Sequence, residues 1–441
     1  MKWDKGWTNL SDPLRYRWLM FFVMGVIYFF ACLHRISTTV IAPDLVLEFS
    51  ADATALGLMS SSYFYLYAAV QPPVGVLSDT LGSRRVISIF TLIACVGAVI
   101  FGTASNMSMA TVGRSFIGIG VGGVFVPALK TFSKWYRQRE FAGVTGLFLA
   151  IGNAGNLSAS LPLTYLVLLL GWRMSFLAMG AASVLLAIIC WGVLRDNPED
   201  KGWRSLEVGD NPLSLASENI PEDIRPHERL RTVFSKPSFW MVTISTFFFG
   251  GPALTFQGLW AVPYLMDVHG YSRLEAGGLL MMIPVGFIIG APTFGFLADK
   301  VALSLKGVLL FSLGLILSCW TIFFLSGAKP NSHYLVPLFL IMGSCGGGSL
   351  SLSMTIMKEL FPPWLTGTAV GLMNPAAFLS TAVFQPLTGF LMDAVGRSGS
   401  VYPLEAYYYV FIVFFISMII AVVTIIPLSI PKIRPPLKRQ I

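Results

Sequence analysis

Long apolar runs alternate with short polar stretches along this chain. A helix needs about 20 apolar residues to cross a bilayer, and by that measure the pattern predicts twelve membrane-spanning helices. They cover residues 18–42, 55–77, 86–105, 107–131, 141–163, 174–194, 239–265, 276–298, 304–326, 334–357, 366–392 and 404–428. No small-residue cleavage site follows the first run, so we expect a retained helix rather than a signal peptide. The pattern therefore predicts an all-α integral membrane protein.

The composition excludes a soluble protein. Of the 441 residues, 55% are apolar and only 12% are charged, whereas soluble proteins use about 25% charged residues. The five cysteines all lie in predicted spans without CxxC spacing, and the four histidines are scattered. This pattern indicates neither disulfides nor a metal site, and we expect no cofactor.

The net charge of +8 first suggests an anionic partner such as a nucleic acid. Twelve spans place both chain ends on one side of the membrane, and cytoplasmic ends put 23 of the 30 Lys and Arg residues inside, as the positive-inside rule requires. Four fall outside: Arg173, Arg273, Lys329 and Arg397. The charge thus predicts orientation in a bacterial-type inner (plasma) membrane and removes the support for nucleic-acid binding. Three basic residues remain within spans: Arg35, Arg114 and Lys130.

A long polar stretch divides the chain into two halves of six predicted helices. We expect a first bundle at 1–194, a cytoplasmic linker at 195–238, a second bundle at 239–428 and a basic cytoplasmic tail at 429–441.

The two halves repeat each other in sequence. The pattern Pro72-x-x-Gly75-x-Leu77-x-Asp79 recurs at 292–299 and again at 386–393. A weaker echo relates Gly118, Gly122, Gly123 and Gly146 to Gly343, Gly347, Gly348 and Gly371. Repeated six-helix halves are typical of secondary transporters that rock about a central site. Glycine near the end of a span predicts close approach of a neighbouring helix, and we expect Asp79 to pair with Arg84 and Arg85.

Two motifs carry a family resemblance. Residues 75–85, Gly-Val-Leu-Ser-Asp-Thr-Leu-Gly-Ser-Arg-Arg, resemble the loop 2–3 motif of the major facilitator superfamily, and Gly113-Arg114-x-x-x-Gly118-x-Gly120 resembles its fourth-helix motif. The resemblance implies two pseudo-symmetric six-helix bundles and alternating access. It also implies a conformational latch formed by Gly75, Asp79, Gly82, Arg84 and Arg85, with a degenerate copy at Gly295 and Asp299.

Within that superfamily, the chain is similar to organic-anion carriers of the anion:cation symporter type. The similarity covers residues 118–136 and 171–173, although Val121 stands where those carriers often have an acidic residue. Residues 152–157 depart from the Gly-Pro-x-x-Gly-Gly pattern of drug/proton antiporters. They also resemble nitrate/nitrite carriers, whose paired arginines in helices 2 and 8 are absent here.

Ionisable residues inside a membrane are costly, at least about 2.5–3.5 kcal/mol for Arg or Lys at a span centre, and usually functional. We expect Arg35 to bind substrate, since no Asp or Glu lies deep in a span to pair with it. Arg114 is a further candidate for the substrate site, and the family resemblance implies that it contacts backbone groups of helix 1 in a structural or coupling role. Lys130 either lines the cavity or extends to the cytoplasmic surface. His34 is the group within these spans that titrates near neutral pH.

The second half contributes only neutral groups to the expected site. Gly250-Gly251-Pro252 is predicted to interrupt the seventh span, as in the discontinuous helices of carriers. The neutral candidates there are Gln257, Trp260, Tyr264 and Asn374, and the second span adds Tyr63 and Tyr67. Packing alone would also explain any one of the aromatic residues.

Up to three positive charges and no negative charge within the spans predict a site for an anion. We expect a secondary transporter of a small organic anion such as a carboxylate. Coupling to protons, through His34 or the substrate, and exchange for a counter-anion both stay open. Alternatives are export of a lipophilic drug and uptake of a zwitterion such as an amino acid. An enzyme is not expected, because the spans hold no nucleophile, acid/base pair or metal cluster. The expected partners are the anion and the lipid bilayer, and we expect the protein to be a monomer.

Overall fold

A computed structural model describes residues 13–203, 226–300, 304–397 and 401–430. Its first half is a group of helices that begins at the start of the described chain. These are α1 (Pro13–Ile36), α2 (Thr38–Phe49), α3 (Ala53–Leu81), α4 (Ser83–Gly102), α5 (Met107–Gly122), α6 (Phe125–Trp135), α7 (Gln138–Ser158) and α8 (Leu161–Val193). A 3-10 turn, η1 (Pro198–Lys201), follows.

The second half is a matching group of helices. It comprises α10 (Pro226–Phe234), α11 (Pro237–Thr255), the π-helical turn η2 (Phe256–Trp260), α12 (Ala261–His269), α13 (Arg273–Leu280), α14 (Met282–Lys300), α15 (Leu305–Leu325), the 3-10 turn η3 (Ser332–Tyr334), α16 (Leu335–Leu360), α17 (Pro363–Met373), α18 (Pro375–Val395) and α19 (Leu404–Ile425). The predicted tail at 429–441 lies almost entirely outside the described residues.

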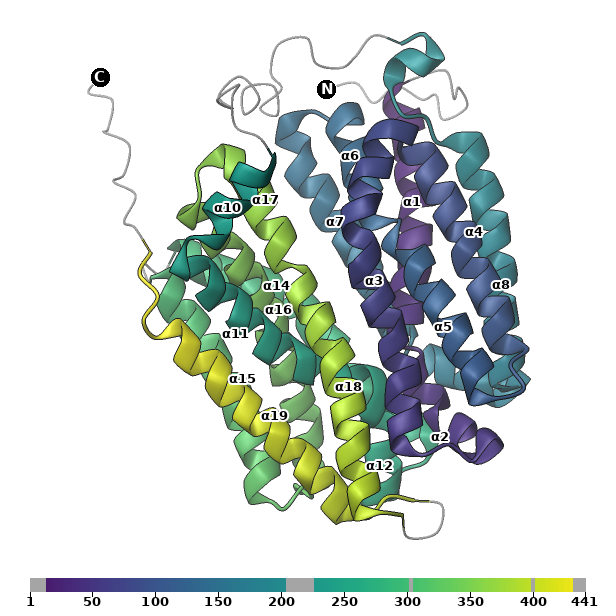
Figure 1. Ribbon diagram of the computed structural model, residues 1–441, viewed down its shortest axis with the longest axis vertical. Coiled ribbons are helices and arrows are strands. Elements are labelled where there is room, and N and C mark those ends of the chain that lie inside the picture. Colours follow the sequence, from purple (N-terminus) through teal and green to yellow (C-terminus); the bar gives the residue numbers. More distant parts are fainter. Residues whose placement is uncertain (1–12, 204–225, 301–303, 398–400, 431–441) are drawn as a thin grey trace, which may run out of the picture.

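The predicted all-α membrane fold is confirmed. Among the described residues, ten helical segments are long and apolar enough to cross a membrane. They coincide with ten of the twelve predicted spans, and α3 and α7 cover the other two. Both helices lie in the first group, where α7 packs against α1 and α3 packs against α5 (Figure 1). Polar residues in α3 and α7 lower their mean hydropathy, so composition alone does not identify them as membrane spans. Packing against the neighbouring helices stabilises them instead.

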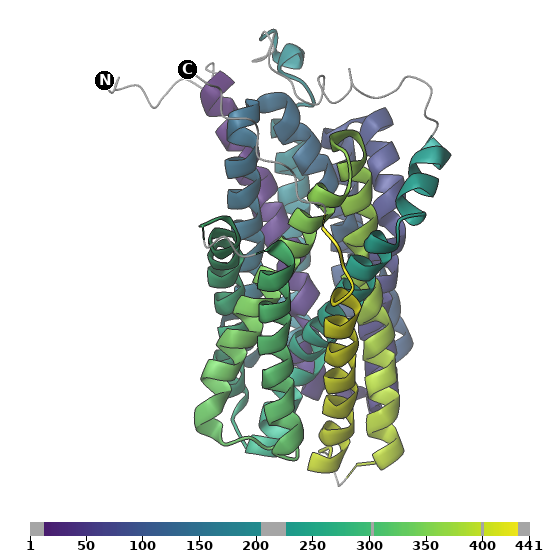
Figure 2. The ribbon, with the colours of Figure 1, turned by 90° about the vertical axis from the view of Figure 1, so that its left-hand side faces the viewer.

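The two groups lie side by side. Figure 1 places η1 and α10 towards one end of the molecule, here named the linker end, and α2 and α12 at the opposite end, here named the far end. Viewed from the side in Figure 2, the green and yellow helices of the second group lie in front of the blue and purple helices of the first. The main interface between the groups is formed by α3 and α18.

The predicted internal repeat is visible in the packing of equivalent glycines. A Cβ atom on Gly118 of α5 would meet the backbone of Tyr63 in α3, and one on Gly343 of α16 would meet the backbone of Ile283. Ile283, in α14, is 220 residues beyond Tyr63, which is the offset of the sequence repeat. The same two helices therefore pack against each other in both halves.

The seventh predicted span is interrupted later than the sequence indicated. α11 continues through Gly250, Gly251 and Pro252, and the irregular turn is η2, four residues further on. Proline has no backbone N–H and clashes with the turn before it, and η2 is the turn before Pro263 of α12, so Pro263 accounts for the irregular turn. π-helical turns occur often at functional sites.

The glycines of the repeated motif do not all allow close packing. A Cβ atom on Gly75 or Gly295 would meet no atom within 4 Å, so the expected close approach of a neighbouring helix there is wrong in this arrangement. Gly389, in the third copy, does pack closely, because its Cβ would overlap the carbonyl of Ala53. Gly389 and Ala53 belong to different halves, so this copy of the motif joins the two groups.

Candidate functional site

Arg35 lies where the two halves meet. It is the penultimate residue of α1, and its guanidinium carbon is 5.6 Å from the ring centre of Tyr67 and 5.0 Å from that of Phe378. Tyr67 belongs to α3 and Phe378 to α18, and their rings are 4.7 Å apart. One cation therefore contacts aromatic side chains of both halves, which is an arrangement that stabilises a positive charge.

Arg114 is completely buried inside the first half. Its Nη1 atom donates a hydrogen bond of 2.8 Å to the carbonyl oxygen of His34. This is the predicted contact with the backbone of helix 1. The guanidinium carbon also lies 4.7 Å from the ring centre of Tyr63.

The two arginines are connected by two tyrosines. The rings of Tyr63 and Tyr67 stack on each other with centres 6.1 Å apart. Arg114, Tyr63, Tyr67 and Arg35 therefore form a continuous row, named here the arginine–tyrosine row. Its two cations lie on α5 and α1, and its two rings are one helical turn apart on α3.

Hydrogen-bond donors of this row lack partners. The Nε atom of Arg35 and the Nε and Nη2 atoms of Arg114 are buried without a hydrogen bond, as is the hydroxyl of Tyr63. Among the described residues, no carboxylate lies within ion-pair distance of either arginine. Burying a charge without a counter-charge is costly, and within the described residues neither arginine has a carboxylate to offset that cost.

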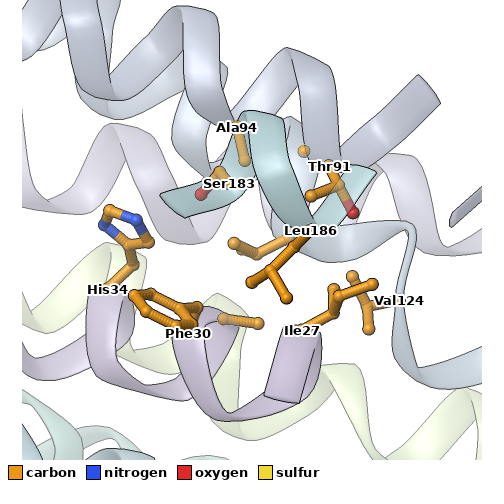
Figure 3. A pocket seen from close by; sticks show the side chains of 11 residues that line it. Ile27, Phe30, His34, Thr91, Ala94, Val124, Ser183 and Leu186 are labelled. Atoms are coloured by element: carbon orange, nitrogen blue, oxygen red, sulfur yellow. The ribbon is translucent and has the colours of Figure 1, made fainter. Parts of the chain in front are cut away.

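His34 points away from the row. Its ring faces a cavity of about 10 Å³ between α1, α4, α5 and α8, lined also by Phe30, Thr91 and Ser183 (Figure 3). Both ring nitrogens are buried without a partner. A cavity of that size holds at most about one water molecule. The structure thus separates His34 from Arg35, although the two residues are adjacent in sequence.

Lys130 lies at the linker end and not in the row. Its Nζ atom forms an ion pair of 2.7 Å with Asp79 and donates a hydrogen bond to the carbonyl of Ser78. The expected pairing of Asp79 with Arg84 and Arg85 is therefore wrong. Those arginines follow in sequence, but the α3–α4 turn directs Arg84 elsewhere, and Lys130 in α6 reaches the carboxylate.

Arg84 holds the start of α4 against the end of α8. Its backbone N–H donates to the carboxylate of Asp196 at 2.9 Å, and its Nε donates to the carbonyl of Trp191 at 2.8 Å. Gly82 precedes it with a φ of 85°, a conformation that favours glycine, and a Cβ there would overlap Asp196. Arg85 is exposed beside this cluster. The side chain of Asp299, in the predicted second copy, lies outside the described residues.

The candidates of the second half are mostly engaged in packing. Trp260 donates from its ring nitrogen to the hydroxyl of Thr388 at 2.8 Å, and Tyr264 donates from its hydroxyl to the carbonyl of Ala328 at 2.7 Å. Gln257 is 8% exposed, within η2. Asn374 connects α17 and α18 directly before the helix that carries Phe378.

Sequence reasoning missed Gln385. This α18 residue is fully buried, and both polar atoms of its side chain lack a hydrogen-bond partner. A glutamine within an apolar span is the sequence feature that could have identified Gln385 as a candidate.

Polar contacts between the halves gather at the far end. The carboxylate of Asp393 in α18 accepts hydrogen bonds from the backbone N–H groups of Ala53 and Thr54 at 2.9 and 2.7 Å, and from the Thr54 hydroxyl at 2.6 Å. Arg273 of α13 forms a two-pronged ion pair with Asp44 of α2, with both distances 2.8 Å. These contacts hold the far end closed. Asp393 was the acidic residue of the third sequence copy, but its role as a tie between halves was not predicted.

Comparison with known proteins agrees with this architecture. Residues 24–328 and 260–441 match the family model described as Major Facilitator Superfamily. Among solved structures, the chain is similar to a bacterial homolog of the human lysosomal transporter Spinster in an inward-facing and unoccupied conformation, with a TM-score of 0.72 and 21% identity, over 93% of this chain and 95% of that one.

Curated relatives cover nearly the same length. A probable sulfoacetate transporter, SauU, of Cupriavidus necator is 26% identical over 88% of this chain and 90% of its own. The hexuronate transporter of Escherichia coli K12 is 22% identical over 87% of this chain and 89% of its own.

Proposed function

The chain belongs to the Major Facilitator Superfamily, and we propose that it transports a small organic anion, such as a carboxylate, by alternating access. It is a multi-pass membrane transporter and not an enzyme. The proposal rests on one observation above all, which is the arginine–tyrosine row, with a fully buried Arg114, a half-buried Arg35 and no described carboxylate beside either cation. An anion bound at Arg35 would supply the missing counter-charge.

The names of the relatives support this substrate class. Sulfoacetate and hexuronates are small organic acids, and the proteins named for their transport match this chain over most of its length. Arg35 contacts aromatic rings of both halves, so an anion bound there would interact with both halves. Rocking of one half against the other would then expose the site alternately on the two sides.

The position of His34 bears on the energy source. Its ring faces the interior of the first half, whereas Arg35 faces α3 and α18. We therefore propose coupling through protonation of the substrate itself, or exchange for a counter-anion, rather than direct proton transfer from His34.

The far end carries three of the four basic residues expected outside the cytoplasm. They contact α2 or the residues just after it, and they are Arg173, Arg273 and Arg397. We propose that this end faces away from the cytoplasm, that both chain ends are cytoplasmic in an inner-type membrane, and that the protein works as a monomer.

A binding experiment tests the substrate class. The purified protein is titrated with glucuronate, sulfoacetate, acetate and the cation choline while its thermal unfolding is followed. The proposal predicts stabilisation by at least one acid and not by choline. Stabilisation by choline alone would contradict it.

Variants then locate the site. We expect Arg35→Gln to lose at least about tenfold in affinity for the acid, since a charged hydrogen bond is worth about 1.5–3 kcal/mol. Arg231→Gln, an exposed arginine on α10, is the control and should bind normally. Equal affinity in both variants would place the anion elsewhere, and unaltered transport by Arg35→Gln would favour export of a lipophilic drug.

A further inference from the structure

Gln385 is a buried polar side chain whose hydrogen bonds are unexplained. Its exposure is 0%, and neither its Oε1 nor its Nε2 atom has a partner. A glutamine amide has two donors and an acceptor with two lone pairs. Native proteins satisfy nearly all such buried groups, and an exception calls for a water, an ion or a ligand that completes it.

The same face of α18 carries Gln385 and the aromatic neighbour of Arg35. Phe378 precedes Gln385 by seven positions, which is almost two helical turns and about 10 Å along the axis. Phe378 contacts Arg35 and Tyr67. The carbonyl of Gln385 packs against Gly57 of α3. Gln385 therefore lies on the α18 face that carries Phe378, at a point where α18 packs against the first half.

Gly258 places the amide near the backbone of Arg35. A Cβ atom on Gly258 would lie 3.9 Å from Nε2 of Gln385 and 3.8 Å from the carbonyl oxygen of Arg35. These are ordinary contact distances, so the amide, the η2 turn and the end of α1 meet at this glycine. Gly258 lies in the irregular π-helical turn, the kind of helix irregularity that is frequent at functional sites.

We propose that Gln385 is a second recognition point for the transported anion. This inference rests on the proposed function, with the acidic group of the substrate at Arg35. The amide of Gln385 then receives a polar group at the other end of the same molecule. Because an amide both donates and accepts hydrogen bonds, it suits a hydroxyl, a sulfonate or a second carboxylate. The substrate class is thus a small organic acid with a second polar end, in preference to a fatty or aromatic monoacid.

The enclosed position of the amide fits this role. Gly57 of α3 packs on the backbone carbonyl of Gln385, and the end of α1 meets its amide at Gly258, so a substrate reaches the amide when the two halves separate towards the far end. An amide left empty disfavours the closed arrangement, and a bound polar group removes that penalty. The ligand that satisfies Gln385 therefore also biases the movement of the two halves.

Matched acids test the proposal. Affinities of the full chain are measured by thermal shift for sulfoacetate and glucuronate, and for butyrate and cyclohexanecarboxylate, which lack the second polar end. Gln385→Met removes the amide at similar volume. We expect it to weaken binding of the first pair about tenfold, as for loss of a hydrogen bond to a polar ligand, and to change binding of the second pair by less than about twofold.

Two further variants keep the outcome decisive. Ser380→Ala, on the same helix, removes a hydroxyl that already donates to the carbonyl of Phe247, and it should alter all four affinities equally. Gln385→Leu also removes the amide, on a shorter side chain, and replaces Gln385→Met if that variant does not fold. Equal weakening for both pairs of acids, or none, would show that Gln385 holds only water and overturn the inference. If no acid binds the wild-type protein, the proposed function fails instead.

Discussion

Asp393 is the residue whose replacement should most change the balance between conformations. Its carboxylate accepts three hydrogen bonds from Ala53 and Thr54 across the interface between the halves. It acts as a cap for α3 that is supplied by the other half, since two of the donors are N–H groups of the first turn. Its own half contributes a fourth hydrogen bond, from Tyr402 at 2.6 Å.

The magnitude follows from these bonds. A hydrogen bond to a charged group contributes about 1.5–3 kcal/mol when buried, and partial exposure of Asp393 reduces this. Allowing about 1 kcal/mol for each bond between the halves, Asp393→Ala should destabilise the closed far end by about 2–3 kcal/mol. That corresponds to a change of roughly 30- to 150-fold in the ratio of closed to open molecules.

Asp52 provides the matched control. Its carboxylate caps the same helix, accepting a hydrogen bond of 2.7 Å from the backbone N–H of Ala55, but both residues belong to the first half. Asp52→Ala should therefore lower the stability of α3 by about 1 kcal/mol without changing the separation of the halves.

Distances between spin labels measure the effect. Leu47 on α2 and Leu404 on α19 are exposed at the far end, and all five native cysteines are buried, so cysteines at these two positions can be labelled. Asp393→Ala should add a population with a longer distance. An unchanged distance distribution, or the same change in Asp52→Ala, would refute the assignment of Asp393 as the tie between the halves.

Two further predictions concern stability. Gly118→Ala should lower the midpoint of thermal unfolding, at a cost of about 1–3 kcal/mol, because the added Cβ would lie 2.8 Å from the Cα of Tyr63. Gly75→Ala is the control and should leave the midpoint unchanged, because its Cβ would meet no atom within 4 Å. Equal midpoints in the two variants would contradict the close packing of α5 on α3. Burial alone would raise the pKa of Glu48, but hydrogen bonds from Arg173 and Trp172 hold that pKa below its usual 4.5. The stability that these contacts add is fully present above pH 4.5 and is lost as the pH falls through the lowered pKa of Glu48. The free energy of unfolding of Glu48→Gln should therefore depend less on pH in that range than that of the wild-type protein. An unchanged pH dependence would show that the contact does not stabilise the protein.

Hydropathy predicted the helices well because the bilayer imposes one length and one composition on every span. Arg35 and Arg114 could be identified from sequence for a related reason, since a cation in an apolar run needs a specific environment. The contact of Arg114 with helix 1 followed from the family motif.

Partners distant in sequence could not be predicted in the same way. Asp79 pairs with Lys130, which is 51 residues away, and not with the arginines that follow it. The motif glycines gave mixed results for a similar reason, because Gly75 and Gly389 share a sequence pattern and differ in which helix lies opposite. His34 and Arg35 are neighbours in sequence and face different helices, since successive residues on a helix are about 100° apart.

The polar groups are distributed unequally along the interface between the two halves. Their positions indicate that the far end and the deeper part of the interface have different functions. At the far end, Asp393 and Arg273 each have hydrogen-bonded partners in the other half, so these contacts contribute to the free energy that opening requires. Deeper in the interface, Arg35 and Gln385 carry buried polar atoms without partners, so a ligand there adds interactions that the empty protein lacks. Substitutions at the far end should therefore shift the conformational balance for every substrate alike. Substitutions at Arg35 or Gln385 should instead change which anion is bound, because there the choice of ligand decides whether these buried polar atoms are satisfied.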